Sequence, residues 1–98
     1  MTKAVEWYAK STEQDNSVAM NNLGYCYQQG NGVDQDMTKA FELYEKSALL
    51  GHSTAMYGVG ACYEEGEGVT KDLNKAKEWY TKSAAQGDSD AQTELAKL

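Results

Sequence analysis

The chain has 98 residues, enough for one small domain, and its 9 Lys and 15 acidic residues, with no Arg, give a net charge of −6. That balance argues against nucleic-acid binding, which needs basic patches. There is no apolar run of the roughly 18 residues expected of a membrane-spanning helix, and the first residues lack the apolar core of a signal peptide. Two Cys are too few for a disulfide scaffold.

The sequence repeats itself at an offset of 36 residues. Segments 19–54 and 55–90 are identical at 18 of 36 positions, far more than chance would give. The start of the chain resembles the second half of this unit, and its end resembles the first half. We therefore predict one domain over 1–98, with a half repeat at 1–18, full repeats at 19–54 and 55–90, and a partial repeat at 91–98.

Apolar residues recur at helical spacing in both halves of each repeat. Ala19, Leu23 and Cys26 follow an i, i+4, i+7 pattern, which predicts a first helix that we call type A. A second helix, type B, is predicted by the i, i+3, i+4, i+7, i+8 spacing of Ala40, Leu43, Tyr44, Ser47 and Ala48. In chain order we expect type B at 2–14, type A at 17–28, type B at 37–50, type A at 53–64, type B at 73–86 and a short type A at 89–97.

Residues typical of helix ends flank these segments. Asp36 and Asp72 are suited to cap the type B helices at their N-termini, and Gly51 and Gly87 to end them in the left-handed conformation. In the first unit the pair Asp15-Asn16 takes the place of that glycine. Three Glu–Lys pairs at i, i+4 are expected to stabilise the type B helices, namely Glu6–Lys10, Glu42–Lys46 and Glu78–Lys82.

One helix pair cannot cover its own apolar stripes, so successive pairs must stack. The predicted fold is an all-α superhelix, a solenoid of antiparallel helix pairs. The repeating aromatic residues are predicted to pack in its core, and truncating Tyr44 or Trp79 should cost about 3–5 kcal/mol. These aromatics are Trp7, Tyr8, Tyr27, Tyr44, Tyr63, Trp79 and Tyr80. Val5 and Trp7 are expected on the outer side of the first helix, as on an unfinished cap.

The motif Ala-x-x-x-Leu-Gly-x-x-Tyr-x-x-Gly-x-Gly-Val-x-x-Asp-x-x-Lys-Ala, from Ala19 to Ala40, resembles the Sel-one-like repeat, a relative of the tetratricopeptide repeat. The resemblance covers essentially the whole chain. It implies a right-handed superhelix whose type A helices line a concave face, and a role as an adaptor between proteins. The family has no common catalytic residues, so the resemblance supplies no active site.

Residues with reactive side chains give little reason to expect an enzyme. Cys26 and Cys62 occupy equivalent positions in successive helices, too far apart for a disulfide, and are expected to be buried free thiols. His52 stands alone, so neither a metal site nor a nucleophile–base pair is expected, and no cofactor. Secreted relatives link helices through paired Cys. The lack of that pairing favours the cytoplasm, although a secreted or lumenal location stays open.

The resemblance places a partner-binding surface on the concave face. Nine residues there are predicted to contact a partner: Asn21, Asn22, Tyr25, Gln28, Gln29, Tyr57, Glu64, Glu65 and Lys97. Tyr25 and Tyr57 are of special interest because they break the repeat and so are free of its packing rule. The acidic, aromatic composition predicts a polar or basic peptide or protein surface as partner. The alternative is head-to-tail self-assembly through the terminal half repeats, in a natural, excised or engineered array.

Overall fold

A computed structural model describes residues 3–98, and those residues form six α-helices without any strand. The helices are α1 (Lys3–Thr12), α2 (Ser17–Gln29), α3 (Met37–Leu49), α4 (Ser53–Glu65), α5 (Leu73–Ala85) and α6 (Ser89–Lys97). The predicted bounds agree with these to within two residues, except that residue 2, the expected start of the first helix, lies outside the described residues.

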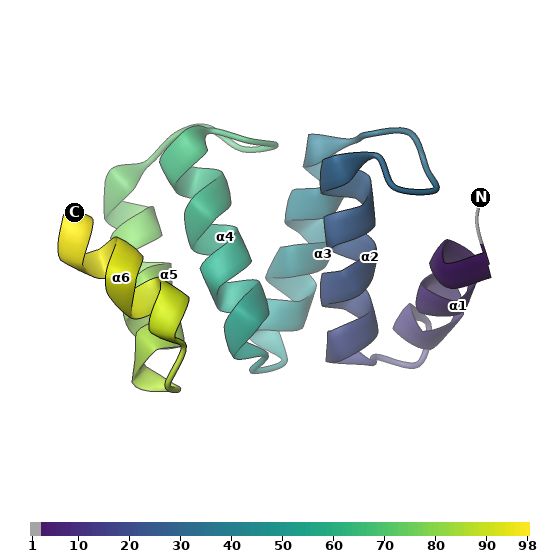
Figure 1. Cartoon of the computed structure of the whole chain (residues 1–98), viewed down its shortest axis with the longest axis horizontal. Helices are drawn as coiled ribbons and strands as arrows, with labels where there is room; N and C mark the ends of the chain where they lie inside the picture. Colours follow the sequence, from purple (N-terminus) through teal and green to yellow (C-terminus); the bar gives the residue numbers. More distant parts are fainter. Residues whose placement is uncertain (1–2) are drawn as a thin grey trace.

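The six helices form two layers. Figure 1 shows α2, α4 and α6, the type A helices, in the nearer layer, with the type B helices behind them and the two termini at opposite ends. Each helix packs mainly against its neighbours in sequence, and the molecule measures 38 × 23 × 17 Å. The predicted all-α solenoid is confirmed.

The predicted helix ends are also confirmed. Asp36 Oδ1 accepts a hydrogen bond from the Lys39 backbone N–H (3.0 Å), and Asp72 Oδ1 accepts one from Lys75 (3.1 Å). Asp15 adopts a positive φ of 56°, so it occupies the left-handed position that glycine holds in the other two units. Local sequence therefore ends each helix at the point where the chain must reverse.

One of the three type A helices lacks a side-chain hydrogen bond at its N-cap. Asn16 and Asp88 cap α2 and α6 through side-chain hydrogen bonds, whereas the equivalent His52 makes no such bond. We expect His52→Asn to raise the free energy of unfolding by about 0.5–1 kcal/mol, because the amide oxygen can accept from a free N–H of the first turn. Urea denaturation followed by circular dichroism measures this. The reciprocal Asn16→His should lose a similar amount, and an unchanged His52→Asn would contradict the capping argument.

The helices are joined across the layers by contacts that repeat with the sequence. The ring of Tyr80 lies against Gly60, where an added Cβ would come within 2.7 Å of the ring. Tyr44 packs against Gly24 in the same way, with a corresponding distance of 3.1 Å. Ser83 Oγ donates a hydrogen bond to the carbonyl oxygen of Ser53 (2.7 Å), and the equivalent serine of α3 does the same in the first repeat. These small residues let a type B helix approach its type A partner closely.

The predictions about the first helix are only partly confirmed. Val5, expected on the outer side, is buried at 1% exposure in a cluster with Leu23, Cys26 and Leu43. Trp7, expected both among the core aromatics and on the outer side of this helix, is 68% exposed, which agrees with the outer side and contradicts the core. Its equivalent Leu43 is buried in the same cluster as Val5, against the preceding helices α1 and α2, whereas no described helix precedes α1. Trp79 is only partly buried, so its truncation should cost less than the core value predicted for it.

The three predicted Glu–Lys pairs of the type B helices do not form ion pairs among the described residues. The ion pair found there joins Lys97 Nζ to Glu94 Oε1 at 3.3 Å, within α6. Lys82 lies over the ring of Trp79 instead, 4.6 Å from its centroid. Long side chains exposed to water gain little from such pairing, and an aromatic face offers an alternative contact.

Both cysteines are buried free thiols, as predicted. Burial raises the pKa of the Cys62 thiol from its ordinary 9.0 to about 12, and burial also raises the pKa values of Tyr44 and Tyr80 above 10.0. Since the folded state holds these protons more tightly than the unfolded chain, their contribution to stability is complete below about pH 9 and is lost as the pH rises toward 12.

We therefore expect the midpoint of thermal unfolding to fall between pH 8 and pH 11. Circular dichroism melts at fixed ionic strength measure this. A Cys62→Ala variant should lose part of the pH dependence, because it removes one of the three groups. A melting temperature that stays constant over this range would show that the three groups titrate alike in the folded and unfolded chains.

Candidate functional site

The layer of type A helices is hollowed between α2 and α4, with the start of α6 at one end. We call this hollow the A-helix groove, and its volume is about 510 Å³. Its lining residues are Asn21, Asn22, Tyr25, Gln28, Tyr44, Thr54, Tyr57, Gly58, Ala61, Asp88 and Asp90. Two helices of successive repeats and the turn that begins the third therefore meet at one surface.

Five of the nine residues predicted to bind a partner line the A-helix groove together: Asn21, Asn22, Tyr25, Gln28 and Tyr57. The other four, Gln29, Glu64, Glu65 and Lys97, do not line it. Gln29 and Glu65 stand exposed at the ends of their helices, beyond the groove. The five residues therefore form one continuous surface. The acidic residues that line the groove are Asp88 and Asp90, and not the predicted Glu64 and Glu65.

Sequence reasoning missed Thr54, Asp88 and Asp90 as lining residues. Thr54 lies three residues before Tyr57, so one turn of helix places both on the same face. Asp90 occupies the same repeat position as Thr54, in α6. Extending the predicted face by one turn toward the helix N-termini would have found both residues.

Two tyrosines supply the aromatic surface of the A-helix groove. Tyr25 is 53% exposed, an unusual state for a large aromatic residue in the middle of a helix. Tyr57 is partly buried, and its ring lies 5.6 Å from the ring of Tyr80 at an angle of 42°. The Tyr25 ring is thus free for contact with a partner, while the Tyr57 ring packs against Tyr80.

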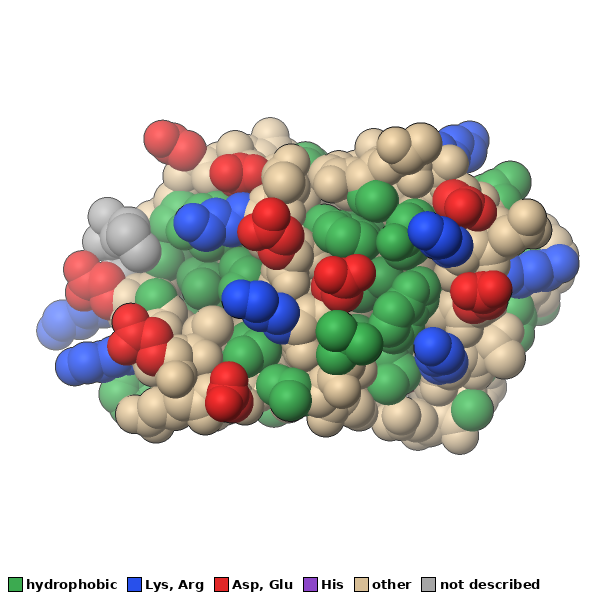
Figure 2. Space-filling model, turned by 180° about the vertical axis from the view of Figure 1, so that it is seen from behind, with side chains coloured by type: hydrophobic (Ala, Val, Ile, Leu, Met, Phe, Trp, Pro, Cys, Tyr) green, Lys and Arg blue, Asp and Glu red, His purple; other side chains and the backbone are tan. Residues whose placement is uncertain are grey.

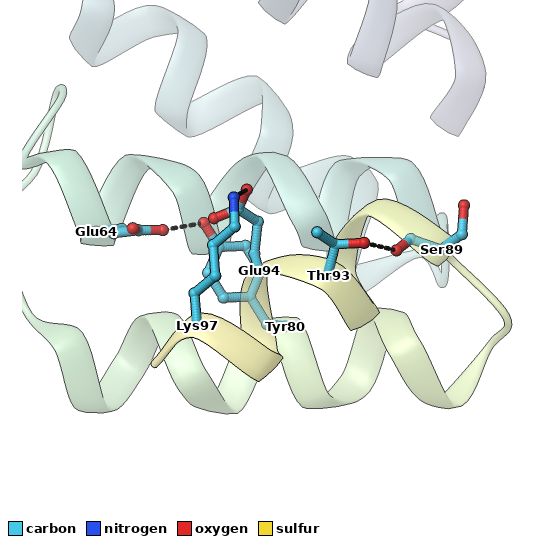
Figure 3. A network of polar contacts seen from close by, with 6 residues as sticks. All are labelled: Glu64, Tyr80, Ser89, Thr93, Glu94 and Lys97. Carbon is cyan, nitrogen blue, oxygen red and sulfur yellow. Dashed lines mark hydrogen bonds and ion pairs between the residues drawn. The ribbon is translucent and has the colours of Figure 1, made fainter.

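Gln28 and Glu64 have a structural task that the sequence analysis did not foresee. The Tyr44 hydroxyl donates a hydrogen bond to Gln28 Oε1 (2.7 Å), and the Tyr80 hydroxyl donates one to Glu64 Oε1 (2.6 Å). Figure 3 shows the Tyr80 ring with its hydroxyl directed at Glu64. Each bond ties a type B helix to the type A helix before it, so a change at Glu64 would disturb the fold as well as the surface.

The end of the A-helix groove beside α6 is acidic. The pKa of Tyr57 is raised first by burial and then by the negative charges of Glu94, Asp90, Asp88 and Glu64, all of which lie near its hydroxyl. Glu94 is already paired with Lys97, as Figure 3 shows. Since no Lys lines the groove in the described part of the chain, the remaining carboxylates are not neutralised there.

One polar atom beside these groups lacks a partner. Asn21 Oδ1 is buried and accepts no hydrogen bond within residues 3–98. A buried acceptor without a donor costs about 1–3 kcal/mol, so this atom is an unused hydrogen-bonding site. Asn21 lines the groove, so a turn of its side chain would bring this oxygen within reach of a bound donor.

The opposite face, formed by the type B helices, is different in character. Figure 2 shows Lys and acidic side chains interspersed among apolar ones on this face. Lys39 and Lys75 lie over the rings of Tyr27 and Tyr63, each 5.5 Å from the centroid. The basic residues of this face are thus partly engaged by its own aromatic residues, and the charges of the two signs are mixed.

The described residues contain no group of three or more His, Cys, Asp or Glu side chains that could hold a metal ion. Within residues 3–98, no helix combines the length and apolarity needed to cross a membrane.

Comparison with known proteins now places the chain. The Sel1 repeat matches residues 1–16, 17–52 and 53–88. The crystal structure of a Sel1 repeat protein from Oxalobacter formigenes is 40% identical, with a TM-score of 0.92, over 96% of this chain and 71% of that one. None of the curated proteins compared with the chain matches it.

Two further solved structures share the fold. One is c5321, a protective antigen of uropathogenic Escherichia coli strains with an SLR fold: it is 36% identical with a TM-score of 0.91, and the match covers 93% of this chain but only 20% of c5321. The other is Helicobacter pylori cysteine rich protein B, 26% identical with a TM-score of 0.87, over 93% of this chain and 68% of that one. The repeats, the helix pairs and these likenesses agree, and the chain belongs to the Sel1 repeat family.

Proposed function

We propose that the chain is a non-catalytic adaptor that holds a partner polypeptide in the A-helix groove. Sel1 repeat proteins generally mediate protein–protein interaction. The observation that carries the choice of face is Tyr25, a half-exposed aromatic side chain that breaks the repeat and lines the groove with Tyr57. Exposed tyrosines in a concave, partly desolvated surface are typical of binding sites. The unneutralised carboxylates favour a polar or basic partner.

Head-to-tail self-assembly is less well supported than binding of another protein. In such an assembly, α6 of one copy would receive α1 of the next as α4 receives α5, and Tyr8 would take the place of Tyr80. Gly60 gives Tyr80 its room, because an added Cβ would lie 2.7 Å from the ring. The equivalent residue of α6 is Ala96, whose Cβ would occupy that space. We therefore favour the adaptor.

The two thiols suit a reducing compartment, and we propose the cytoplasm as the site of action. Cys26 and Cys62 are both free and buried. Their burial in separate apolar clusters leaves them without a role in linking helices.

Affinity capture from the source cell tests the proposed function. Immobilised wild-type chain should retain a protein that the double variant Tyr25→Ala/Tyr57→Ala does not retain. Trp7→Ala is the matched control, because Trp7 is an exposed aromatic residue on α1, outside the groove. A partner retained equally by all three proteins would place the binding surface elsewhere, and circular dichroism confirms that each variant is folded.

A further inference from the structure

We infer that the A-helix groove contains a subsite for one positively charged side chain of the partner, bound beside Tyr25 and Tyr57 at the end near α6. The inference rests on the proposed function and adds the chemistry of recognition to it. It uses three features of the groove that are independent of one another: its charge, its aromatic rings and an unpartnered acceptor.

The charge around the subsite is negative, and no Lys within residues 3–98 lines it. Asp88 and Asp90 line the groove, and Tyr57 experiences both of them together with Glu64 and Glu94. The one cation on α6 that could compensate, Lys97, is held by Glu94 at 3.3 Å. Asp88 Oδ1 accepts the capping hydrogen bond of Ala91, which satisfies one lone pair but leaves the charge in place. A cation from outside would therefore meet an attractive field.

The subsite offers acceptors to a positively charged side chain. The carboxylate of Asp90 is exposed at the first turn of α6, and Asn21 Oδ1, which is buried without a donor, becomes a second acceptor when its side chain turns toward the groove. Gln28 Oε1 already accepts one hydrogen bond, from the Tyr44 hydroxyl. Lys and Arg side chains carry only donors, so they match this set, whereas a carboxylate or phosphate would find repulsion.

The rings and the floor of the groove suit the flat or compact head of such a side chain. Tyr25 offers an exposed ring, and cations bind favourably over the faces of aromatic rings. Gly58 stands where α2 has Asn22, and an added Cβ there would lie 3.2 Å from the ring of Tyr44. The missing side chain keeps the floor open above that ring, at the one glycine that departs from the repeat.

Nuclear magnetic resonance titration of the full chain tests the subsite. The probes are N-acetyl-arginine amide and its neutral isostere, N-acetyl-citrulline amide. We expect the arginine derivative to shift the backbone resonances of Tyr25 and Tyr57 and the side-chain amide of Asn21. Its affinity should exceed that of the citrulline derivative roughly fivefold or more, because only the arginine derivative is charged.

Two variants separate a local site from a general charge effect. Asp90→Asn should weaken binding of the arginine derivative roughly two- to fivefold, since it removes a lining carboxylate. Glu65→Gln removes the same charge from an exposed position outside the groove and should leave the affinity unchanged. Equal affinity for both probes, equal effects of both variants, or shifts confined to other residues would each overturn the subsite. The affinity-capture result for Tyr25→Ala/Tyr57→Ala would still decide the proposed function separately.

Discussion

Replacing Tyr80 by alanine is expected to lower the free energy of unfolding by about 3–5 kcal/mol, the range for truncating a buried aromatic side chain. The Tyr80 side chain is 1% exposed, its ring rests on Gly60 and against Tyr57, and its hydroxyl donates to Glu64 Oε1 at 2.6 Å. The truncation removes contacts between α4 and α5 and leaves a cavity between them. Urea denaturation followed by circular dichroism at 222 nm measures the loss.

Two controls divide this effect into its parts. Tyr80→Phe keeps the ring but loses the hydrogen bond to Glu64, and we expect it to cost about 1–2 kcal/mol. Trp7→Ala removes an even larger aromatic side chain, but one that is 68% exposed, and it should change the stability by about 0.5 kcal/mol or less. If Trp7→Ala cost as much as Tyr80→Ala, the positions of both rings would be wrong.

Gly68→Ala is expected to destabilise the fold by about 3 kcal/mol or more, for two reasons that add. Gly68 has a φ of 71°, which alanine adopts only with strain. An added Cβ would also overlap the backbone carbonyl oxygen of Met37, at the start of α3. A backbone group of a helix cannot rotate away as a side chain can, so the loop after α4 would have to move off α3.

Gly51→Ala is the matched control for this prediction. Gly51 also has a positive φ, of 95°, but an added Cβ there would meet nothing within 4 Å. It should therefore show the strain alone, about 1–2 kcal/mol. The difference between the two variants, measured by urea denaturation, reports the contact between the loop and α3. Equal losses would show that the loop does not rest on Met37.

The fold could be predicted from the sequence because each of its determinants is local and occurs more than once. The apolar spacing, the capping Asp residues and the left-handed Gly positions act within a few residues, and the repeat shows each of them again 36 positions later. The repeated pattern alone does not place Trp7, which was expected both in the core and on the outer side of the first helix. Its equivalent Leu43 is buried against helices that precede α3, whereas no described helix precedes α1 and Trp7 is exposed.

The A-helix groove was predicted only in part, for a similar reason. The face of α2 and α4 follows from helical geometry, so Tyr25 and Tyr57 were found. Glu64 was predicted only as a surface residue. Its hydrogen bond to Tyr80 joins residues 16 positions apart across a loop, and the spacing within one helix does not reveal such a bond. Asp90 was missed because the predicted face stopped one turn short of the N-terminus of α6, and Asp88 was missed because it lies before that helix, as its N-cap.

Site-specific photocrosslinking tests most directly whether a partner docks in the A-helix groove. A photoreactive phenylalanine derivative is placed at position 25, in the groove, or at position 49, where Leu49 is 72% exposed on α3 outside it. With a partner obtained by affinity capture, we expect a covalent adduct from position 25 and none from position 49. An adduct from position 49 alone would contradict the assignment of the groove as the docking surface.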